Sequence, residues 1–312
     1  SAHKFFPYGG WSWGWMGDPD QGYGPQQPGG WIYAVTPYLE EKTVFDLGKG
    51  LSWNQKKVQL AKQMEVVIPV FNCPTRRSGL NQPARSPDGR YCDGGADDKL
   101  KNANVPNTMA KSDYAINGGS GKLPTGVDGQ PDPDCLQPST GDFGDSPGRY
   151  PECNFQVANA NLPTVLLGWG GISTHRGGAK FSQITDGASQ TALVGEKMMQ
   201  PKFYSGECNE PGSNPSNGNG GDNNAMYQGY DYDNSRWTAP EQDVDFPTGQ
   251  HGNHHSKFGS AHASGIHLAL CDGSVQTIDY DIDKVVWGNY IKRNNSQSIS
   301  EPLNYEELDS PN

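Results

Sequence analysis

Histidines are concentrated near the carboxyl end of the chain, where they could act together as metal ligands. The stretch "GQHGNHHSKFGSAH" holds four of the seven histidines, and His267 follows shortly after it. Imidazole binds Zn²⁺ and Cu²⁺, but the H-E-x-x-H spacing that places two histidines on one helix face is absent. The intervening glycines favour an irregular connection. We therefore expect a solvated loop here and no metal site; its histidines are His251, His254, His255 and His262.

Clustered carboxylates are a second feature that could bind a cation. The groupings are "CDGGADD", "DGQPDPD", "DYDN" and "DYDID". None follows the D-x-[DN]-x-[DN]-G register that ends in a glutamate twelve positions along, and aspartate is also a common turn residue. The sequence therefore predicts no cofactor; Ca²⁺ is the one ion that the composition allows, with no loop assigned to it.

Catalytic motifs are missing from the chain. There is no G-x-S-x-G nucleophile motif and no glycine-rich phosphate loop after a predicted strand. Glu196 in "LVGEK" could be a buried carboxylate at a strand end. A glycosidase, however, needs two carboxylates at a defined separation in space, which a sequence does not display. We expect a protein that is not an enzyme and that has no catalytic residue.

Three tryptophans, Trp11, Trp13 and Trp15, occupy alternate positions in "YGGWSWGWMGDPD". At about 25 cal/mol per Å² of buried apolar surface, exposing three indoles would forgo on the order of 10 kcal/mol. Packing beneath a neighbouring helix, contact with another subunit and stacking against sugar rings could each cover them. Burial is the usual fate of tryptophan, so packing within or between subunits is favoured over sugar stacking.

The composition predicts a lean core with many loops. Of 312 residues, 33% are hydrophobic, and 41 are glycine and 24 proline. The formal net charge is -11, and no cationic cluster exceeds two residues. Binding to nucleic acid needs several convergent cations, so a nucleic-acid partner is not expected.

Six cysteines lie far apart in the sequence, mostly in polar, turn-rich surroundings. They are Cys73, Cys92, Cys135, Cys153, Cys208 and Cys271. An even number of such cysteines favours disulfides and an oxidising compartment, although fifteen pairings are open. Pairing Cys73 with Cys92 and Cys135 with Cys153 would close loops of about 20 residues, each contributing about 3 kcal/mol. Cys208 and Cys271 would then remain, although Cys271 could also be a buried thiol.

The elements that would position these residues are short. We expect a helix within residues 29–50 that is interrupted at Pro37, and a second helix over residues 52–64. Expected strands cover residues 66–71, 112–119, 163–174, 191–194 and 225–237. The clearest signal is a hairpin in "GIHLALCDGSVQTIDYDID", with its turn at Asp272-Gly273. In its first strand Ile266, Leu268 and Leu270 would face inward, whereas His267, Ala269 and Cys271 would face outward.

No repeated β-helix-β unit appears, so we expect an α+β fold with a mainly antiparallel sheet, short helices and long loops held by disulfides. One elaborated globular domain over residues 1–312 is expected. It would comprise a Trp-rich segment with a short helix (1–50), a loop-rich insert (75–162), a sheet core with the terminal hairpin (163–296) and an acidic tail (297–312).

At the hairpin the sequence resembles a known family. His262, nine intervening residues and then Asp272-Gly273 resemble the signature of prepilin-like proteins of unknown function, which carry a processing-associated His-x9-Asp-Gly motif. Further segments resemble that family in the same order: "GWIYAVTPYLEEKTVFDLG", "VFNCPTRR", "KSDYAINGG", "QITDGASQTALVGEK" and "SAHASGIHLALCDGSVQTI".

The resemblance implies a pilin-like globular head, exported and located at the cell surface or secreted. It implies a non-enzymatic structural subunit that assembles with copies of itself or related subunits into a filament or layer. Family members begin with a leader and a long apolar helix, and "SAHKFFPYGG" resembles the sequence just after that helix. Contact with the membrane is therefore expected only through that missing helix. His262, Asp272 and Gly273 would be structural and brace the hairpin.

Two alternatives remain open at this point. One is an extracytoplasmic module that binds glycans or other solutes and uses Trp11, Trp13 and Trp15 as a stacking surface. The other is a hydrolase centred on Glu196 or on the His-rich stretch.

Overall fold

The computed structural model describes ten segments of the chain, with gaps between them: residues 3–11, 13–24, 26–77, 79–86, 89–92, 100–119, 170–174, 177–208, 221–247 and 254–294. Several sequence predictions lie wholly or partly outside these residues. They concern Cys135 and Cys153, His251, most of the loop-rich insert, most of the strand expected over residues 163–174, and the acidic tail.

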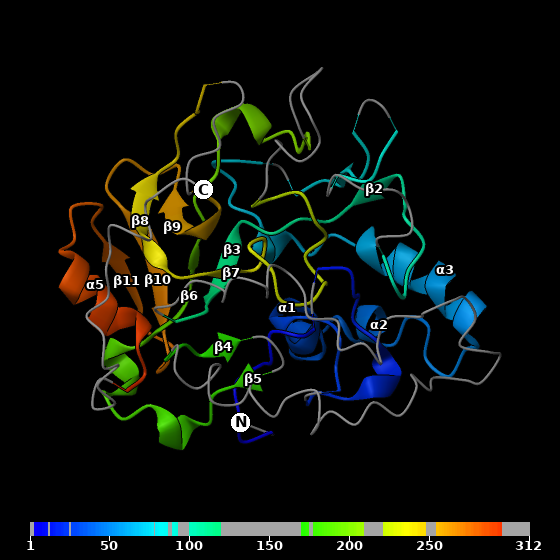
Figure 1. The fold of residues 1–312 in the computed structure, drawn as a ribbon, viewed down its shortest axis with the longest axis horizontal. Helices are drawn as coiled ribbons and strands as arrows, with labels where there is room; N and C mark the ends of the chain where they lie inside the picture. Colours follow the sequence, from blue (N-terminus) through cyan, green and yellow to red (C-terminus); the bar gives the residue numbers. More distant parts are fainter. Residues whose placement is uncertain are drawn as a thin grey trace.

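The largest sheet has five strands in the order β11-β10-β6-β3-β7 (Figure 1). Neighbouring strands are antiparallel, except that β3 and β7 are parallel. The strands of this sheet are β3 (Tyr114–Asn117), β6 (Ala192–Glu196), β7 (Ser235–Arg236), β10 (Ile266–Leu270) and β11 (Val275–Ile278).

Three two-stranded sheets complete the strands of the described segments. β1 with β2 and β4 with β5 are antiparallel, whereas β8 and β9 are parallel. Their bounds are β1 (Gln82–Pro83), β2 (Thr108–Met109), β4 (Ser173–Thr174), β5 (Gly177–Gly178), β8 (Thr238–Gln242) and β9 (Lys257–Ser260). The expected α+β class with mainly antiparallel sheets is confirmed.

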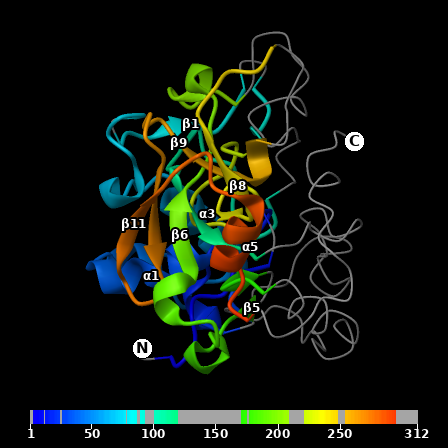
Figure 2. The same cartoon turned by 90° about the vertical axis from the view of Figure 1, so that its left-hand side faces the viewer.

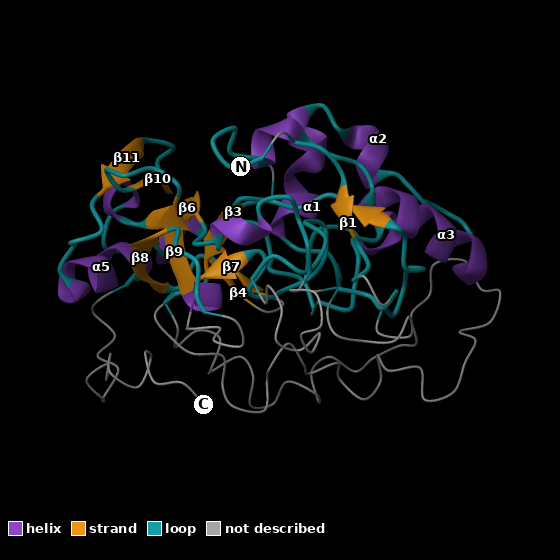
Figure 3. Cartoon of the chain, turned by 90° about the horizontal axis from the view of Figure 1, so that it is seen from above, coloured by secondary structure: helices purple, strands orange, loops and turns teal. Residues whose placement is uncertain are grey.

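The α-helices α1, α2 and α3 lie at the end of the molecule away from β10 and β11, whereas α5 lies beside the large sheet (Figure 3). The α-helices are α1 (Trp31–Val35), α2 (Lys42–Phe45), α3 (Trp53–Met64) and α5 (Lys284–Ile291). Short 3-10 turns are η1 (Pro19–Gln21), η2 (Thr36–Leu39), η3 (Pro69–Phe71), η6 (Phe181–Gln183), η7 (Ala188–Gln190), η8 (Pro201–Phe203) and η10 (His254–Ser256). No helix in the described segments is long and apolar enough to span a bilayer.

The predicted helices are confirmed in outline. The first is broken into α1 and η2 at the position of Pro37, which lacks the amide hydrogen that a longer helix would need. The second, α3, begins directly after Ser52 and ends at Met64. Leu60 and Met64 from its inner face are fully buried in one of the core clusters.

The hairpin of β10 and β11 is confirmed, with its turn at Asp272-Gly273. Figure 2 shows the hairpin beside β6, with α5 near the same sheet. Gly273 has φ +89°, the left-handed region that glycine adopts without steric cost. On β10 the predicted inward residues are buried, and Trp287 and Ile291 of α5 join them in one hydrophobic cluster.

Two of the predicted strands are wrong. Residues 66–71 end in the 3-10 turn η3, since Pro69 cannot donate a ladder hydrogen bond. Residues 225–237 form turns with only β7 at their end. Side-chain bonds replace the expected ladder there, because the Asn234 amide donates to the carbonyls of Gln228 and Gly229.

Two of the three amino-terminal tryptophans are core residues. Trp11 and Trp15 are 1% and 0% exposed, and their rings pack edge to face with centroids 4.9 Å apart. Trp13 is half-buried. Of the two kinds of packing that the sequence favoured over sugar stacking, packing within the chain accounts for Trp11 and Trp15, and these two rings offer no open face for sugar stacking.

The disulfide pairing differs from the one that short loops suggested. Cys92 is bonded to Cys208, 116 residues away, while Cys73 and Cys271 are buried thiols. The expected Cys73–Cys92 and Cys208–Cys271 pairs are therefore wrong. Cys271 also faces inward rather than outward, and burial, reinforced by Asp272, raises the pKa of its thiol to about 12. Sequence spacing misled here because the fold brings distant loops together.

A buried ion network links segments that lie far apart between residues 77 and 222. The Arg77 guanidinium donates to both carboxylate oxygens of Asp222, at 2.8 and 2.9 Å, and its Nε donates to Asp113 at 2.6 Å. The Lys197 ammonium reaches Asp222 at 3.0 Å. Burial by itself would raise the pKa of Asp222, but the charges of Arg77, Lys197 and Lys111 outweigh burial and hold that pKa well below its usual range.

We expect Asp222→Asn to destabilise the protein strongly, by about 3–5 kcal/mol, because it leaves buried cations without their shared counter-ion. Chemical denaturation measures this loss. The matched control is Asp46→Asn, since Asp46 also pairs with two lysines, Lys42 and Lys49, but at the surface. The control should shift the midpoint little, because exposed pairs contribute little.

The same interaction predicts an acid dependence. The pKa of Asp222 is lower in the folded state than in the unfolded chain, so its contribution is complete above about pH 4 and is lost as the pH falls below that. Equal midpoints for Asp222→Asn and Asp46→Asn, or an unchanged acid dependence in Asp222→Asn, would contradict this role.

Candidate functional site

Glu196, at the end of β6, is the centre of a small cluster of ionisable side chains. It is 1% exposed. The His262 ring, from the connection between β9 and β10, places Nε2 3.5 Å from Glu196 Oε1. His267 on β10 places Nδ1 3.4 Å from Glu196 Oε2. The two imidazole rings meet edge to face, with centroids 5.3 Å apart.

Cys73 completes the cluster from the other half of the chain. Its Sγ lies 3.9 Å from His262 Nε2. The Cys73 backbone N–H donates to Asp113 Oδ2 at 2.6 Å, and the other oxygen of Asp113 accepts from Arg77. The buried ion network therefore fixes the position of this thiol.

Backbone and hydroxyl groups orient the Glu196 carboxylate. The Ser260 hydroxyl donates to Oε1 at 2.9 Å, and the His267 backbone N–H donates to Oε2 at 2.8 Å. The Tyr280 hydroxyl approaches the His262 carbonyl at 2.6 Å and the Ser260 carbonyl at 3.0 Å. The Ser260 and His267 contacts hold the two ends of the β9–β10 connection against the end of β6, and Tyr280 bonds the connection itself, so the carboxylate and the His262 ring are kept together.

Two phenols near the cluster stay neutral over the physiological range. Burial raises the pKa of Tyr114 to about 12, and Glu196 and Cys73 add to the effect. Burial likewise raises the pKa of Tyr280 to about 12, with contributions from Asp243 and Glu196. Both phenols therefore stay protonated, and the Tyr280 hydroxyl acts as a hydrogen-bond donor.

The arrangement does not match a cysteine-histidine-carboxylate relay. In such a relay one ring nitrogen faces the nucleophile and the other is oriented by the acid. Here the Cys73 sulfur and the Glu196 carboxylate both approach the same nitrogen, Nε2 of His262. The cluster is therefore a set of converging electron-pair donors, and a hydrolase centred on Glu196 gains no support from its geometry.

The residues of the His-x9-Asp-Gly signature do not form one site. His262 and Asp272 flank β10 at its opposite ends. Asp272 accepts hydrogen bonds from the backbone N–H and the hydroxyl of Ser274 within the hairpin turn, at 2.9 and 2.7 Å. His262 instead contacts Glu196 of the neighbouring strand, so the two signature residues stabilise different parts of the sheet.

The described part of the His-rich stretch, residues 254–262, is not the solvated loop that the sequence suggested. His254 is 1% exposed, and the His255 ring packs edge to face on Tyr232. His262 and His267 are drawn into the Glu196 cluster. Cys73 was missed as a member of this cluster, because nothing in the spacing of "FNCPTRR" indicates a residue 189 positions away. One sequence feature links the two segments: "VFNCPTRR" and the hairpin segment both resemble the same family.

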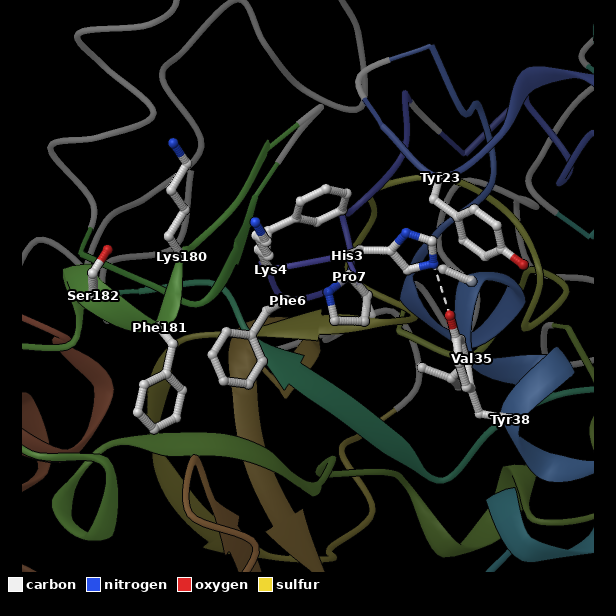
Figure 4. Close-up of a pocket in the computed structure, with 12 residues that line it drawn as sticks. His3, Lys4, Phe6, Pro7, Tyr23, Val35, Tyr38, Lys180, Phe181 and Ser182 are labelled. Atoms are coloured by element: carbon white, nitrogen blue, oxygen red, sulfur yellow. Dashed lines mark hydrogen bonds between the residues drawn. The ribbon is translucent and has the colours of Figure 1, made fainter. Parts of the chain in front are cut away.

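A second feature is an aromatic groove of about 790 Å³ between the amino-terminal segment, the α1–η2 region and η6 (Figure 4). His3 stacks on Tyr23 at 4.2 Å and hydrogen-bonds the Tyr38 hydroxyl at 2.7 Å. At the other end, Phe6 and Phe181 stack with centroids 6.3 Å apart. Tyr38 and Phe181 are 57% and 60% exposed, so both present ring surface to solvent.

Gly195, which precedes Glu196 on β6, is closely packed against neighbouring side chains. A Cβ on the preceding residue, Gly195, would lie 2.9 Å from Leu268 Cδ1 and from Phe258 Cδ1. Gly195→Ala should therefore destabilise the protein by about 1–3 kcal/mol through overpacking. The control is Gly24→Ala, where a Cβ meets nothing within 4 Å. Thermal or chemical unfolding of both variants checks this, and equal stabilities would show that β6 has room to move.

Comparison with known proteins identifies the family. A search of the curated proteins finds no match, and neither does a search of the solved structures. A family model described as "Protein of unknown function (DUF1559)", with the short name SBP_bac_10, matches residues 1–285. That match spans both the Glu196 cluster and the aromatic groove, and the chain belongs to this family of proteins of unknown function.

Proposed function

We propose that this chain is the globular head of a pilin- or pseudopilin-type subunit with a structural, non-enzymatic role. The subunit would assemble with copies of itself or related subunits into a filament or layer at the cell surface or outside the cell. The proposal starts from the resemblance to prepilin-like proteins and is supported by how the resembling segments are used in the fold.

The observation that carries the proposal is that these segments bury their charged residues against one another. Arg77 of "FNCPTRR" bonds Asp113 of "KSDYAINGG", and both lie in the network that includes Lys197 of "LVGEK". Ser260 of the final segment bonds Glu196, the other charged residue of "LVGEK". Motifs used in this way preserve a fold, as a subunit of an assembly requires.

Location outside the cytoplasm is part of the proposal. The Cys92–Cys208 bond is compatible with an oxidising compartment, where disulfides form and persist. The formal charge of -11 is consistent with a partner other than nucleic acid.

The test is to follow the full-length gene product in the cells that make it. We expect it in the surface or extracellular fraction, and immunogold labelling with electron microscopy should place it on ordered filaments or layers. Cells that lack the gene are the control and should lack the labelled structures. A product that stays monomeric and absent from the surface fractions would refute the structural role.

The aromatic groove supports a second candidate function, binding of a glycan or another ring-bearing solute. Trp11 and Trp15 are buried, so a stacking site would use the exposed rings of Tyr38 and Phe181 instead. Aromatic rings in a groove can stack on the apolar faces of a ligand. Polar groups that line the groove, such as Lys180, can bond the ligand's polar groups.

For this function we expect binding in a glycan panel that is reduced at least tenfold in a Tyr38→Ala, Phe181→Ala double variant. Isothermal titration calorimetry is the suitable measurement, because the buried tryptophans need not report on the groove. Leu80→Ala is the control, since Leu80 is 71% exposed and does not line the groove. No binding across the panel would remove this alternative.

A further inference from the structure

We propose that Cys73, Glu196 and His262 form a binding site for a divalent transition-metal ion of the Zn²⁺ type, with His267 beside it as a further ligand. This site goes beyond the structural role proposed above. It also revises our sequence expectation, which placed no metal in the His-rich stretch.

The first argument is convergence. The Cys73 sulfur, a Glu196 carboxylate oxygen and a ring nitrogen of His262 all lie within 4.8 Å of one another. The S-to-N separation is 3.9 Å, and the N-to-O separation is 3.5 Å. In a tetrahedral zinc site with bonds of 2.0–2.3 Å, neighbouring ligand atoms lie roughly 3.3–3.6 Å apart. Two of the three separations are thus near those of a tetrahedral site and the third is within 4.8 Å, so an ion could be shared after a modest contraction of the cluster.

The second argument is the identity of the donors. Ca²⁺ and Mg²⁺ prefer oxygen ligands throughout, whereas a set of one thiolate, one imidazole and one carboxylate suits a borderline-soft ion such as Zn²⁺. When Cys73 and Glu196 are both deprotonated, their two negative charges balance a divalent cation. An ion bound here would therefore leave no net charge buried at the end of β6.

The third argument is support from surrounding groups. Metal ligands are usually oriented by hydrogen bonds from a second layer of residues. Ser260 Oγ and the His267 backbone N–H bond the two oxygens of Glu196, and Asp113 bonds the Cys73 backbone N–H. The donors thus sit on a strand and a loop that other parts of the fold hold in place.

The fourth argument is access. The side chains of Glu196 and Cys73 are buried, but those of His262 and His267 are 32% and 53% exposed. An ion can therefore enter from the histidine side. The His267 ring, with Nδ1 3.4 Å from Glu196 Oε2, is close enough to supply a fourth donor after a small rotation.

The test is to titrate the tag-free, metal-stripped chain with Zn²⁺ and to measure stoichiometry after dialysis by elemental analysis. We expect one equivalent of Zn²⁺ that survives dialysis. Co²⁺, used as a spectroscopic substitute, should show a thiolate-to-metal charge-transfer band and the visible bands typical of tetrahedral coordination.

Variants separate this site from other donors. Cys73→Ser should abolish the charge-transfer band, and Cys73→Ser and His262→Gln should each weaken Zn²⁺ binding at least tenfold. Cys271→Ser and His255→Gln are the matched controls and should bind as the wild type does. They replace a second buried thiol and a second histidine of the same stretch, neither of which belongs to the cluster.

Circular dichroism checks that each variant is folded. If Cys73→Ser does not fold, His262→Gln still tests the site, because the His262 side chain is partly exposed. Three outcomes would overturn the proposal. The wild type could retain no Zn²⁺, the Co²⁺ complex could lack the thiolate band, or binding could be lost in His255→Gln and kept in His262→Gln.

Discussion

The fold depends on the burial of Arg77 between Asp113 and Asp222. Burying a guanidinium and two carboxylates is tolerated only if nearly all of their donors and acceptors are hydrogen-bonded. Here Arg77 bonds Asp113 and Asp222, which are 36 and 145 residues away in the sequence. Such a network is satisfied only when several distant segments are in place together. It therefore selects one arrangement of loops, where hydrophobic contacts alone would tolerate many.

This requirement explains how a chain with few hydrophobic residues and many glycines and prolines holds a defined structure. Its apolar side chains are divided among several small clusters rather than gathered in one core. A second buried ion group, Lys56 with Asp18 and Asp20, ties helix α3 to the amino-terminal loops in the same manner. Buried hydrogen bonds and ion pairs specify the arrangement of the chain where little apolar surface is buried.

The Glu196 cluster is an extension of the same network. Asp113 uses one oxygen for Arg77 and the other for the backbone of Cys73, so the residue that anchors the fold also positions the thiol. On the opposite side, the Ser260 hydroxyl attaches the start of the β9–β10 connection to Glu196 of β6, and the Tyr280 hydroxyl, which follows β11, bonds the His262 carbonyl within that connection. The segments that contain Cys73, Glu196 and His262 thus both stabilise the fold and bring a sulfur, a carboxylate and an imidazole close together.

The sequence predicted those elements that depend on residues close together along the chain. Alternation of Ile266, Leu268 and Leu270 with a following Asp-Gly turn specified the hairpin, and the helix expected over residues 52–64 is α3. Composition indicated many loops, and the lack of a repeated β-helix-β unit indicated α+β. Tertiary structure alone decided that Cys92 pairs with Cys208 and that Cys73 meets His262. The reason is physical: a turn or a helix depends on neighbours along the chain, whereas these contacts depend on the closure of long loops, which leaves no trace in residue spacing.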